Sequence, residues 1–124
     1  MNMEKKVIFI VDDKDTIGKI ISFYLSKEYE CRYFDNPLKA LREMQSGNLP
    51  DLIISDIRMP EMRGDEFLRT IKTNELYKDI LVVMLSSEDS TTERIRLLGD
   101  GAEDYIVKPF NPLELKIRIQ KILK

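Results

Sequence analysis

The chain alternates short apolar runs with segments of helix length, and this alternation limits the fold more than any other feature of the sequence. Five runs are rich in strand-forming residues: Val7 to Val11, Cys31 to Phe34, Leu52 to Ser55, Leu81 to Leu85 and Tyr105 to Val107. The first, third and fourth runs are apolar over nearly their whole length, which is typical of strands that are covered on both faces. We therefore expect these three strands to lie in the centre of a sheet.

The segments between these runs carry the pattern of amphipathic helices. Apolar residues recur at helical spacing in four of them, at Ile17, Ile20, Ile21, Tyr24 and Leu25, at Leu38, Leu41 and Met44, at Phe67, Leu68 and Ile71, and at Ile95 and Leu98. Asn36 followed by Pro37 is a helix-start signal, and Gly99 is a helix-stop signal. Strands and helices that alternate in this way predict an α/β fold with a parallel sheet, right-handed crossovers and helices on both faces.

The last segment, residues 111–124, alternates apolar and polar residues as a strand would. Its first residues favour a helix instead, because Asn111 can be the N-cap, Pro112 the first helical residue and Glu114 a capping-box partner. On a helical wheel the apolar residues fall on two faces, Leu115, Ile119 and Ile122 on one, Leu113 and Ile117 on the other. One face can pack on the sheet, and the other needs an explanation.

Composition narrows the range of functions. The length of 124 residues predicts one domain that spans residues 1–124. A net charge of -2 argues against an intrinsic nucleic-acid surface. The chain has no histidine, so the commonest general base and metal ligand are absent.

The single Cys31 lies in a predicted strand and is expected to be a small core residue. Because no membrane span or secretory signal is recognisable, we expect a cytoplasmic protein without a membrane partner.

Acidic residues follow two of the predicted central strands. Asp12 and Asp13 come directly after the first apolar run, and Asp56 comes directly after the third. If those strands are neighbours, the three carboxylates meet at the carboxyl edge of the sheet, where parallel α/β folds bind ligands. Like charges that close cannot all stay ionised without a cation. Because all the ligands are oxygens, the trio predicts a Mg²⁺ site.

Two further strand ends add to the same edge, because Ser86 follows the fourth run and Lys108 follows the fifth. Acids, a hydroxyl and an ammonium group together would bind a phosphoryl group, since the cations neutralise its oxygens and the hydroxyl donates a hydrogen bond. One of the acids could be the nucleophile, because Asp forms aspartyl phosphate in known phosphotransfer enzymes. Each residue alone has a structural explanation as a turn, a cap or a surface lysine. Their occurrence at four strand ends favours a site.

This set of residues resembles the motifs of the response-regulator receiver domains of two-component signalling, chemotaxis response regulators among them. The matching elements are Asp12-Asp13, Asp56 with Met59-Pro60 following, Ser86, and Lys108-Pro109-Phe110. The resemblance covers the chain from Lys6 to Leu123. It implies a flavodoxin-like (βα)5 three-layer sandwich whose five-stranded parallel sheet has the order 2-1-3-4-5.

The resemblance also implies a role for each matching residue. Asp56 would be the phosphoacceptor, assisted by Ser86 and Lys108. Mg²⁺, or Mn²⁺ in its place, would be held by Asp12, Asp13, Asp56 and the backbone carbonyl of Arg58. The phosphoryl donor would be a histidine kinase, a histidine phosphotransfer protein or a small acyl phosphate. The chain would be a signalling switch, not an enzyme, that catalyses its own phosphotransfer and slow autodephosphorylation.

Switching in this family implies a movement of Ser86 toward the phosphoryl oxygens and an inward turn of Tyr105. The surface of the fourth helix, fifth strand and fifth helix would then change shape and control a partner or an output domain. The Lys108–Pro109 peptide bond is expected to be cis, a form available at low cost only before proline.

Two expectations extend this picture. Leu113 and Ile117 lie on the switching surface, so we expect a phosphorylation-promoted partner or homodimer contact there. The equal alternative is that they are scattered exposed apolar residues, which are normal. Arg58 and Glu88 flank the path of the hydrolytic water in this family, and a pair of opposite charges there would slow loss of the phosphoryl group.

Three other interpretations remain. Asp13 and Asp15 would form the DxD motif of a haloacid-dehalogenase-type phosphohydrolase, which usually needs a longer chain and further motifs. A receiver-like interaction module that works without phosphorylation would have the same fold, although its site residues would have no reason to be intact. A flavodoxin-like cofactor binder is disfavoured, because the loop after the first strand is acidic. Both a stand-alone receiver and the receiver of a longer regulator are compatible with the sequence.

Overall fold

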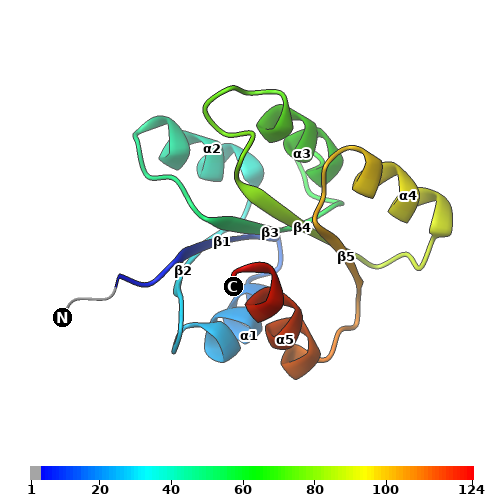
Figure 1. Ribbon diagram of the computed structural model, residues 1–124. Helices are drawn as coiled ribbons and strands as arrows, with labels where there is room; N and C mark the ends of the chain where they lie inside the picture. Colours follow the sequence, from blue (N-terminus) through cyan, green and yellow to red (C-terminus); the bar gives the residue numbers. More distant parts are fainter. Residues whose placement is uncertain (1–3) are drawn as a thin grey trace.

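Five parallel strands form one sheet in the order β2-β1-β3-β4-β5, as the resemblance implied. The computed structural model describes residues 4–124, so residues 1–3 of the predicted domain lie outside the described residues. The elements in chain order are β1 (Val7–Val11), α1 (Asp15–Leu25), β2 (Glu30–Phe34), α2 (Pro37–Gln45), β3 (Leu52–Asp56), α3 (Gly64–Lys72), β4 (Leu81–Ser86), α4 (Thr91–Gly99), β5 (Asp104–Val107) and α5 (Pro112–Ile122). Figure 1 shows α2, α3 and α4 on one face of the sheet, and α1 and α5 on the other. The predicted α/β fold is confirmed.

The apolar runs fill both sides of the sheet, because successive side chains of a strand point to opposite faces. On β1, Phe9 and Val11 pack in the cluster beneath α2 and α3, whereas Ile8 and Ile10 pack in the cluster beneath α1 and α5. All four side chains are fully buried. The prediction that the first, third and fourth strands are central is therefore confirmed.

Asn36 and Asn111 cap their helices as predicted, but Glu114 does not complete the predicted capping box: its carboxylate pairs with Arg118 at 3.1 Å, and within residues 4–124 it forms no bond to the Asn111 N–H. The Asn36 side chain accepts a hydrogen bond from the Lys39 N–H at 3.2 Å at the start of α2. Asn111 caps α5 by accepting hydrogen bonds from the N–H groups of Leu113 and Glu114. Within the described residues no helix is both long and apolar enough to cross a bilayer.

The two faces of α5 are separated as the helical wheel predicted. Leu115 and Ile119 are buried beneath the sheet, whereas Leu113 is 60% exposed and Ile117 is 53% exposed. The helix therefore packs one apolar face on β1, β3 and β4 and leaves the other in solvent. This arrangement also excludes a sixth strand at residues 112–122.

The inward face of α4 differs from the prediction. Ile95 is 65% exposed and Leu98 is 42% exposed, whereas Leu97 is fully buried in the core. The helix turns Glu93 and Leu97 inward, which lie one turn apart on one face. The prediction failed because three apolar residues on a short helix do not define which side faces the sheet.

The structure also changes the account of Cys31, which is only partly buried at the edge strand β2 and packs against the cluster under α1 and α5. Burial raises the pKa of the Cys31 thiol to about 11, so the thiolate needed for reactivity is scarce at neutral pH.

Candidate functional site

The predicted acids meet at the carboxyl edge of the sheet. Asp12 directly follows β1, Asp56 is the last residue of β3, and these strands are hydrogen-bonded neighbours. Carboxylate oxygens of Asp12, Asp13 and Asp56 lie within 4.8 Å of one another. Asp12 and Asp56 are buried and Asp13 is exposed, so the cluster opens to solvent on one side. Three oxygen donors of this kind could hold a metal ion.

Lys108 brings a positive charge into this cluster. Its ammonium nitrogen lies 2.9 Å from Asp12 Oδ2 and 3.2 Å from Asp56 Oδ1. Burial alone would lower the pKa of Lys108, but the carboxylates of Asp12 and Asp56 outweigh it and raise the pKa above its ordinary value. The Lys108 N–H donates to the Ser86 carbonyl at 2.7 Å, and the Lys108–Pro109 peptide bond is cis. The lysine is therefore charged and directed at both acids.

The electrostatics of Asp56 are set by burial. Burial and the neighbouring Asp12 carboxylate raise the pKa of Asp56, while Lys108 and the Ile57 N–H oppose this effect. The Ile57 N–H donates to Asp56 Oδ1 at 2.9 Å. A carboxylate in this position is partly desolvated, has a fixed direction and lies beside an ammonium group, which are the requirements of an oxygen nucleophile that attacks an anionic centre.

The loop after β3 keeps Asp56 in place through a close backbone contact. The Gly64 N–H donates to the Ile57 carbonyl at 2.7 Å. A Cβ atom on Gly64 would clash with the backbone carbonyl of Asp56 and with Ile57. Only glycine permits this approach of α3 to the end of β3.

Asp12 is held by neighbours from three parts of the chain. Its Oδ1 accepts a hydrogen bond from the Lys14 N–H at 2.9 Å, and its carbonyl accepts one from the Tyr33 hydroxyl at 2.6 Å. Together with Lys108, these contacts fix both the backbone and the carboxylate. Asp15, in contrast, lies in the first turn of α1, where it forms an exposed ion pair with Lys19.

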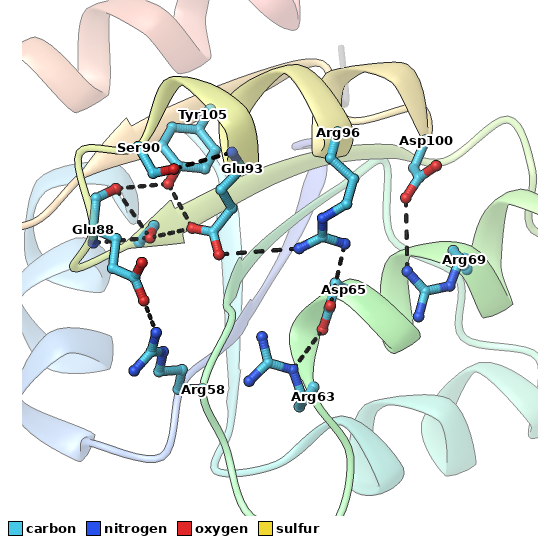
Figure 2. A network of polar contacts seen from close by, with 11 residues as sticks. Arg58, Arg63, Asp65, Arg69, Glu88, Ser90, Glu93, Arg96, Asp100 and Tyr105 are labelled. Atoms are coloured by element: carbon cyan, nitrogen blue, oxygen red, sulfur yellow. Dashed lines mark hydrogen bonds and ion pairs between the residues drawn. The ribbon is translucent and has the colours of Figure 1, made fainter.

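Ser86 and Tyr105 lie on neighbouring strands, and a glutamate joins them. The Ser86 hydroxyl donates to Glu93 Oε1 at 2.8 Å, and the Tyr105 hydroxyl lies 2.6 Å from the same oxygen. The Tyr105 side chain is already inside the molecule, at 4% exposure, and contacts the Glu88 carbonyl at 2.7 Å. The expected inward turn of Tyr105 therefore has little distance left to cover. Figure 2 shows Tyr105 and Glu93 facing one another below α4.

Sequence reasoning did not single out Glu93. Its signal was the pattern Ser90-x-x-Glu93 at the start of α4, which is typical of a helix capping box and predicts a purely local role. The structure gives the glutamate a contact with a predicted switch residue instead.

The remaining predicted residues lie around this centre. The Arg58 and Glu88 side chains form an ion pair between the loop after β3 and the loop after β4, and both are substantially exposed. Leu113 and Ile117 lie on the solvent face of α5, outside the acidic cluster. The structure thus brings Asp12, Asp13, Asp56 and Lys108 into contact, with Ser86 beside them on β4.

Comparison with known proteins gives a consistent result. The response regulator receiver domain family matches residues 8–120. The histidine kinase P4 of Formosa agariphila is 40% identical over 121 residues, which are 98% of this chain and 9% of that protein. The phosphate regulon transcriptional regulatory protein PhoB of Pseudomonas aeruginosa is 37% identical over 123 residues, 98% of this chain and 53% of that protein. The chain thus spans about half of PhoB and about a tenth of the kinase.

Among solved structures, the chemotaxis response regulator CheY4 of Vibrio cholerae superimposes with a TM-score of 0.87 at 32% sequence identity. The match covers 95% of this chain and 98% of that chain. A response regulator from Chloroflexus aurantiacus superimposes with a TM-score of 0.89 at 31% identity.

Proposed function

Since the chain belongs to the family of response regulator receiver domains, we propose that it is a phosphorylation-dependent signalling switch with Asp56 as its phosphoacceptor. Residues 1–124 would form this one receiver domain. The observation that carries the proposal is the contact of a charged lysine with two buried acids at the carboxyl edge of the sheet. An arrangement of this kind stabilises a transferring phosphoryl group through electrostatics.

In the proposed reaction, an oxygen of the Asp56 carboxylate forms a new bond to phosphorus. The bond from phosphorus to the donor breaks, and its electron pair leaves with the donor, a histidine nitrogen of a kinase or phosphotransfer protein or the carboxylate of a small acyl phosphate. The Lys108 ammonium group lies 3.2 Å from Asp56 Oδ1, so it would stabilise the negative charge of the phosphoryl oxygens during the transfer.

The acidic cluster fits a hard cation because its three side chains offer only oxygen donors. Asp12, Asp13, Asp56 and the Arg58 carbonyl would hold Mg²⁺ or Mn²⁺, which when bound supplies charge neutralisation to the phosphoryl oxygens. Asp12 is held in position by hydrogen bonds from Lys14 and Tyr33, whereas Asp13 is exposed to solvent.

The buried hydroxyl groups of Ser86 and Tyr105 would couple phosphorylation to a change at α4. Ser86 would turn its single hydrogen from Glu93 to a phosphoryl oxygen, and the packing of α4 on β5 would change with it. Because Tyr105 is already buried, the proposed switch depends more on Ser86 and α4 than on a large movement of the tyrosine.

The exposed apolar face of α5 is proposed as a contact with a partner or a second copy of the chain. Leu113→Glu/Ile117→Glu should abolish any increase in mass on treatment with Mg²⁺ and beryllofluoride, measured by gel filtration with multi-angle scattering. Leu76→Glu is the matched control, because Leu76 is also highly exposed but lies before β4. An unchanged mass of the native chain under both conditions would remove this proposal.

The Arg58–Glu88 ion pair is proposed to slow hydrolysis by covering the side from which water approaches. An exposed pair contributes little energy, ~0 to 1 kcal/mol, so Arg58→Ala should speed dephosphorylation by no more than about fivefold. Arg42→Ala, on the exposed surface of α2, is the control. Equal dephosphorylation rates for Arg58→Ala and the native chain would refute the role.

The site of phosphorylation separates this function from its rivals. After incubation with acetyl phosphate and Mg²⁺, borohydride reduction should convert the acyl phosphate to homoserine at residue 56. Modification at Asp13 would favour the phosphohydrolase, and an unmodified chain would favour an interaction module that works without phosphorylation. The exposed position of Asp15 on α1 argues against the DxD arrangement.

A further inference from the structure

We propose that Glu93 is a positioning residue that holds the Ser86 hydroxyl in the unphosphorylated arrangement, and so opposes phosphorylation at Asp56. The inference rests on the proposed phosphoacceptor function and adds a control element to it. It starts from the two hydroxyls that converge on one carboxylate oxygen, that of Glu93.

Glu93 is diverted from the local role that its sequence position predicts. Ser90 caps α4 by accepting a hydrogen bond from the Glu93 N–H at 3.1 Å. In a complete capping box the glutamate side chain would return to the Ser90 N–H. Within residues 4–124 no such bond forms, and Glu93 Oε1 instead accepts from Ser86 at 2.8 Å and lies 2.6 Å from the Tyr105 hydroxyl. The Glu93 carboxylate therefore contacts Ser86 and Tyr105 instead of capping the start of α4.

A serine hydroxyl has one hydrogen, so Ser86 donates to one acceptor at a time. Ser86 Oγ lies 2.8 Å from Glu93 Oε1 and 3.3 Å from the Glu88 carbonyl, so Glu93 is the nearer acceptor, and Oγ accepts the Glu88 N–H at 3.0 Å. A phosphoryl oxygen can only accept, so Ser86 must leave Glu93 before it can donate to a phosphoryl group. Tyr105 has an alternative acceptor in the Glu88 carbonyl at 2.7 Å and can release Glu93 without losing its hydrogen bond.

The second carboxylate oxygen of Glu93 also lies near a charged group. Arg96 lies between Glu93 Oε2, at 4.0 Å, and Asp65 Oδ2, at 3.3 Å. Asp65, at the start of α3, also accepts a hydrogen bond from Arg63 Nε at 3.1 Å. Figure 2 shows this chain of charges running from the loop before α3 to the underside of α4. Because its side chain is only 13% exposed, Glu93 has little freedom to turn away into solvent.

Two effects follow for a phosphoryl group at Asp56. The hydrogen bond from Ser86 to Glu93 is lost on phosphorylation, and a carboxylate near the site repels the incoming negative charge. Removal of Glu93 should therefore tighten binding of a phosphoryl mimic. A hydrogen bond of ordinary net strength corresponds to a change of about threefold to tenfold in affinity.

The test is the dissociation constant of beryllofluoride with Mg²⁺, measured by calorimetry on the whole chain. Glu93→Ala should bind about threefold to tenfold more tightly than the native chain. Glu93→Gln keeps an acceptor oxygen at the same reach without the charge, so its affinity should lie between the two. Glu114→Ala is the matched control, because Glu114 occupies the same third position of α5 behind an Asn111 cap and should leave the constant unchanged.

A second measurement reports on the contact itself. Burial raises the pKa of Tyr105, and the hydrogen bond to Glu93 raises it further. Tyrosine ring ¹³C NMR should therefore show a lower pKa for Tyr105 in Glu93→Ala than in the native chain, with no phosphoryl chemistry involved.

Equal dissociation constants for Glu93→Ala and the native chain would overturn the inference, and so would an equal gain in Glu114→Ala. If Glu93→Ala does not fold, the same comparison applies to Glu93→Gln, and no gain in its affinity overturns the inference. A native chain that binds no beryllofluoride would overturn the proposed function, and the inference would fail with it. A native chain that binds as tightly as its variants overturns the role of Glu93 alone.

Discussion

The contact of Gly64 with the end of β3 leads to a prediction with a defined sign and size. Gly64→Ala places a Cβ atom against the Asp56 carbonyl and Ile57, both of which are backbone and cannot rotate away. Overpacking of this kind costs about 1 to 3 kcal/mol. The 2.7 Å hydrogen bond from the Gly64 N–H to the Ile57 carbonyl is strained by the same shift, which adds about 1 kcal/mol.

Alanine gains up to about 1 kcal/mol over glycine in a helix, so we expect Gly64→Ala to lower the free energy of unfolding by about 1 to 4 kcal/mol. For a domain of this size, that loss lowers the melting temperature by about 4 °C per kcal/mol. Urea denaturation followed by circular dichroism measures it. Beryllofluoride affinity should fall as well, because the displaced backbone belongs to Asp56, the proposed phosphoacceptor.

Gly99→Ala is the matched control. Gly99 ends α4, has no atom within 4 Å of an added Cβ and has no positive φ, so alanine should stabilise the chain by about 0.4 to 1 kcal/mol. The reasoning is refuted if Gly64→Ala unfolds within about 0.5 kcal/mol of the native chain and binds beryllofluoride as well. The loop would then have room that the structure does not show.

Three further predictions concern stability. Glu61 has a φ of 74°, which L-residues rarely adopt, so Glu61→Asn should raise the urea midpoint by the equivalent of about 0.5 to 1 kcal/mol. Asn111→Ala removes the cap of α5 and should cost about 1 kcal/mol in the same assay; no loss would mean that the helix start needs no cap. Burial alone would raise the pKa of Asp65, but Arg63 and Arg96 outweigh it and hold the pKa below the ordinary 3.8. The stabilisation from Asp65 is therefore complete above that ordinary value and is lost as the pH falls through the lower folded value. Asp65→Asn should be less stable than the native chain at pH 7, by a margin that shrinks toward pH 2.5; a constant margin would contradict the pKa shift.

Much of the fold and of the acidic cluster could be predicted from local patterns. Residues such as Ile8 and Phe9 belong to a short continuous apolar run, which is typical of a strand covered on both faces. Once those strands are neighbours in a parallel sheet, acids at their carboxyl ends must meet, as Asp12 and Asp56 do. The sequence alone carried this part of the site because backbone direction determines it.

The features that were missed depend on contacts between distant elements. Glu93 fits a local capping box, but the hydroxyls of Ser86 and Tyr105 compete for its carboxylate once α4 packs on β5. Leu97, one turn after Glu93 on the same face, is buried, whereas Ile95 is exposed. No spacing along the chain indicates how a helix rotates about its axis when few of its residues are apolar.

The central claim is that Asp56 accepts a phosphoryl group with the help of a cation held by its neighbours. The measurement that tests it most directly is the intact mass of the chain after incubation with acetyl phosphate and Mg²⁺, beside Asp56→Asn and a sample with excess EDTA. The account predicts one phosphoryl group on the native chain and none in either control. A native chain without the adduct, or an adduct of equal yield on Asp56→Asn, would contradict it.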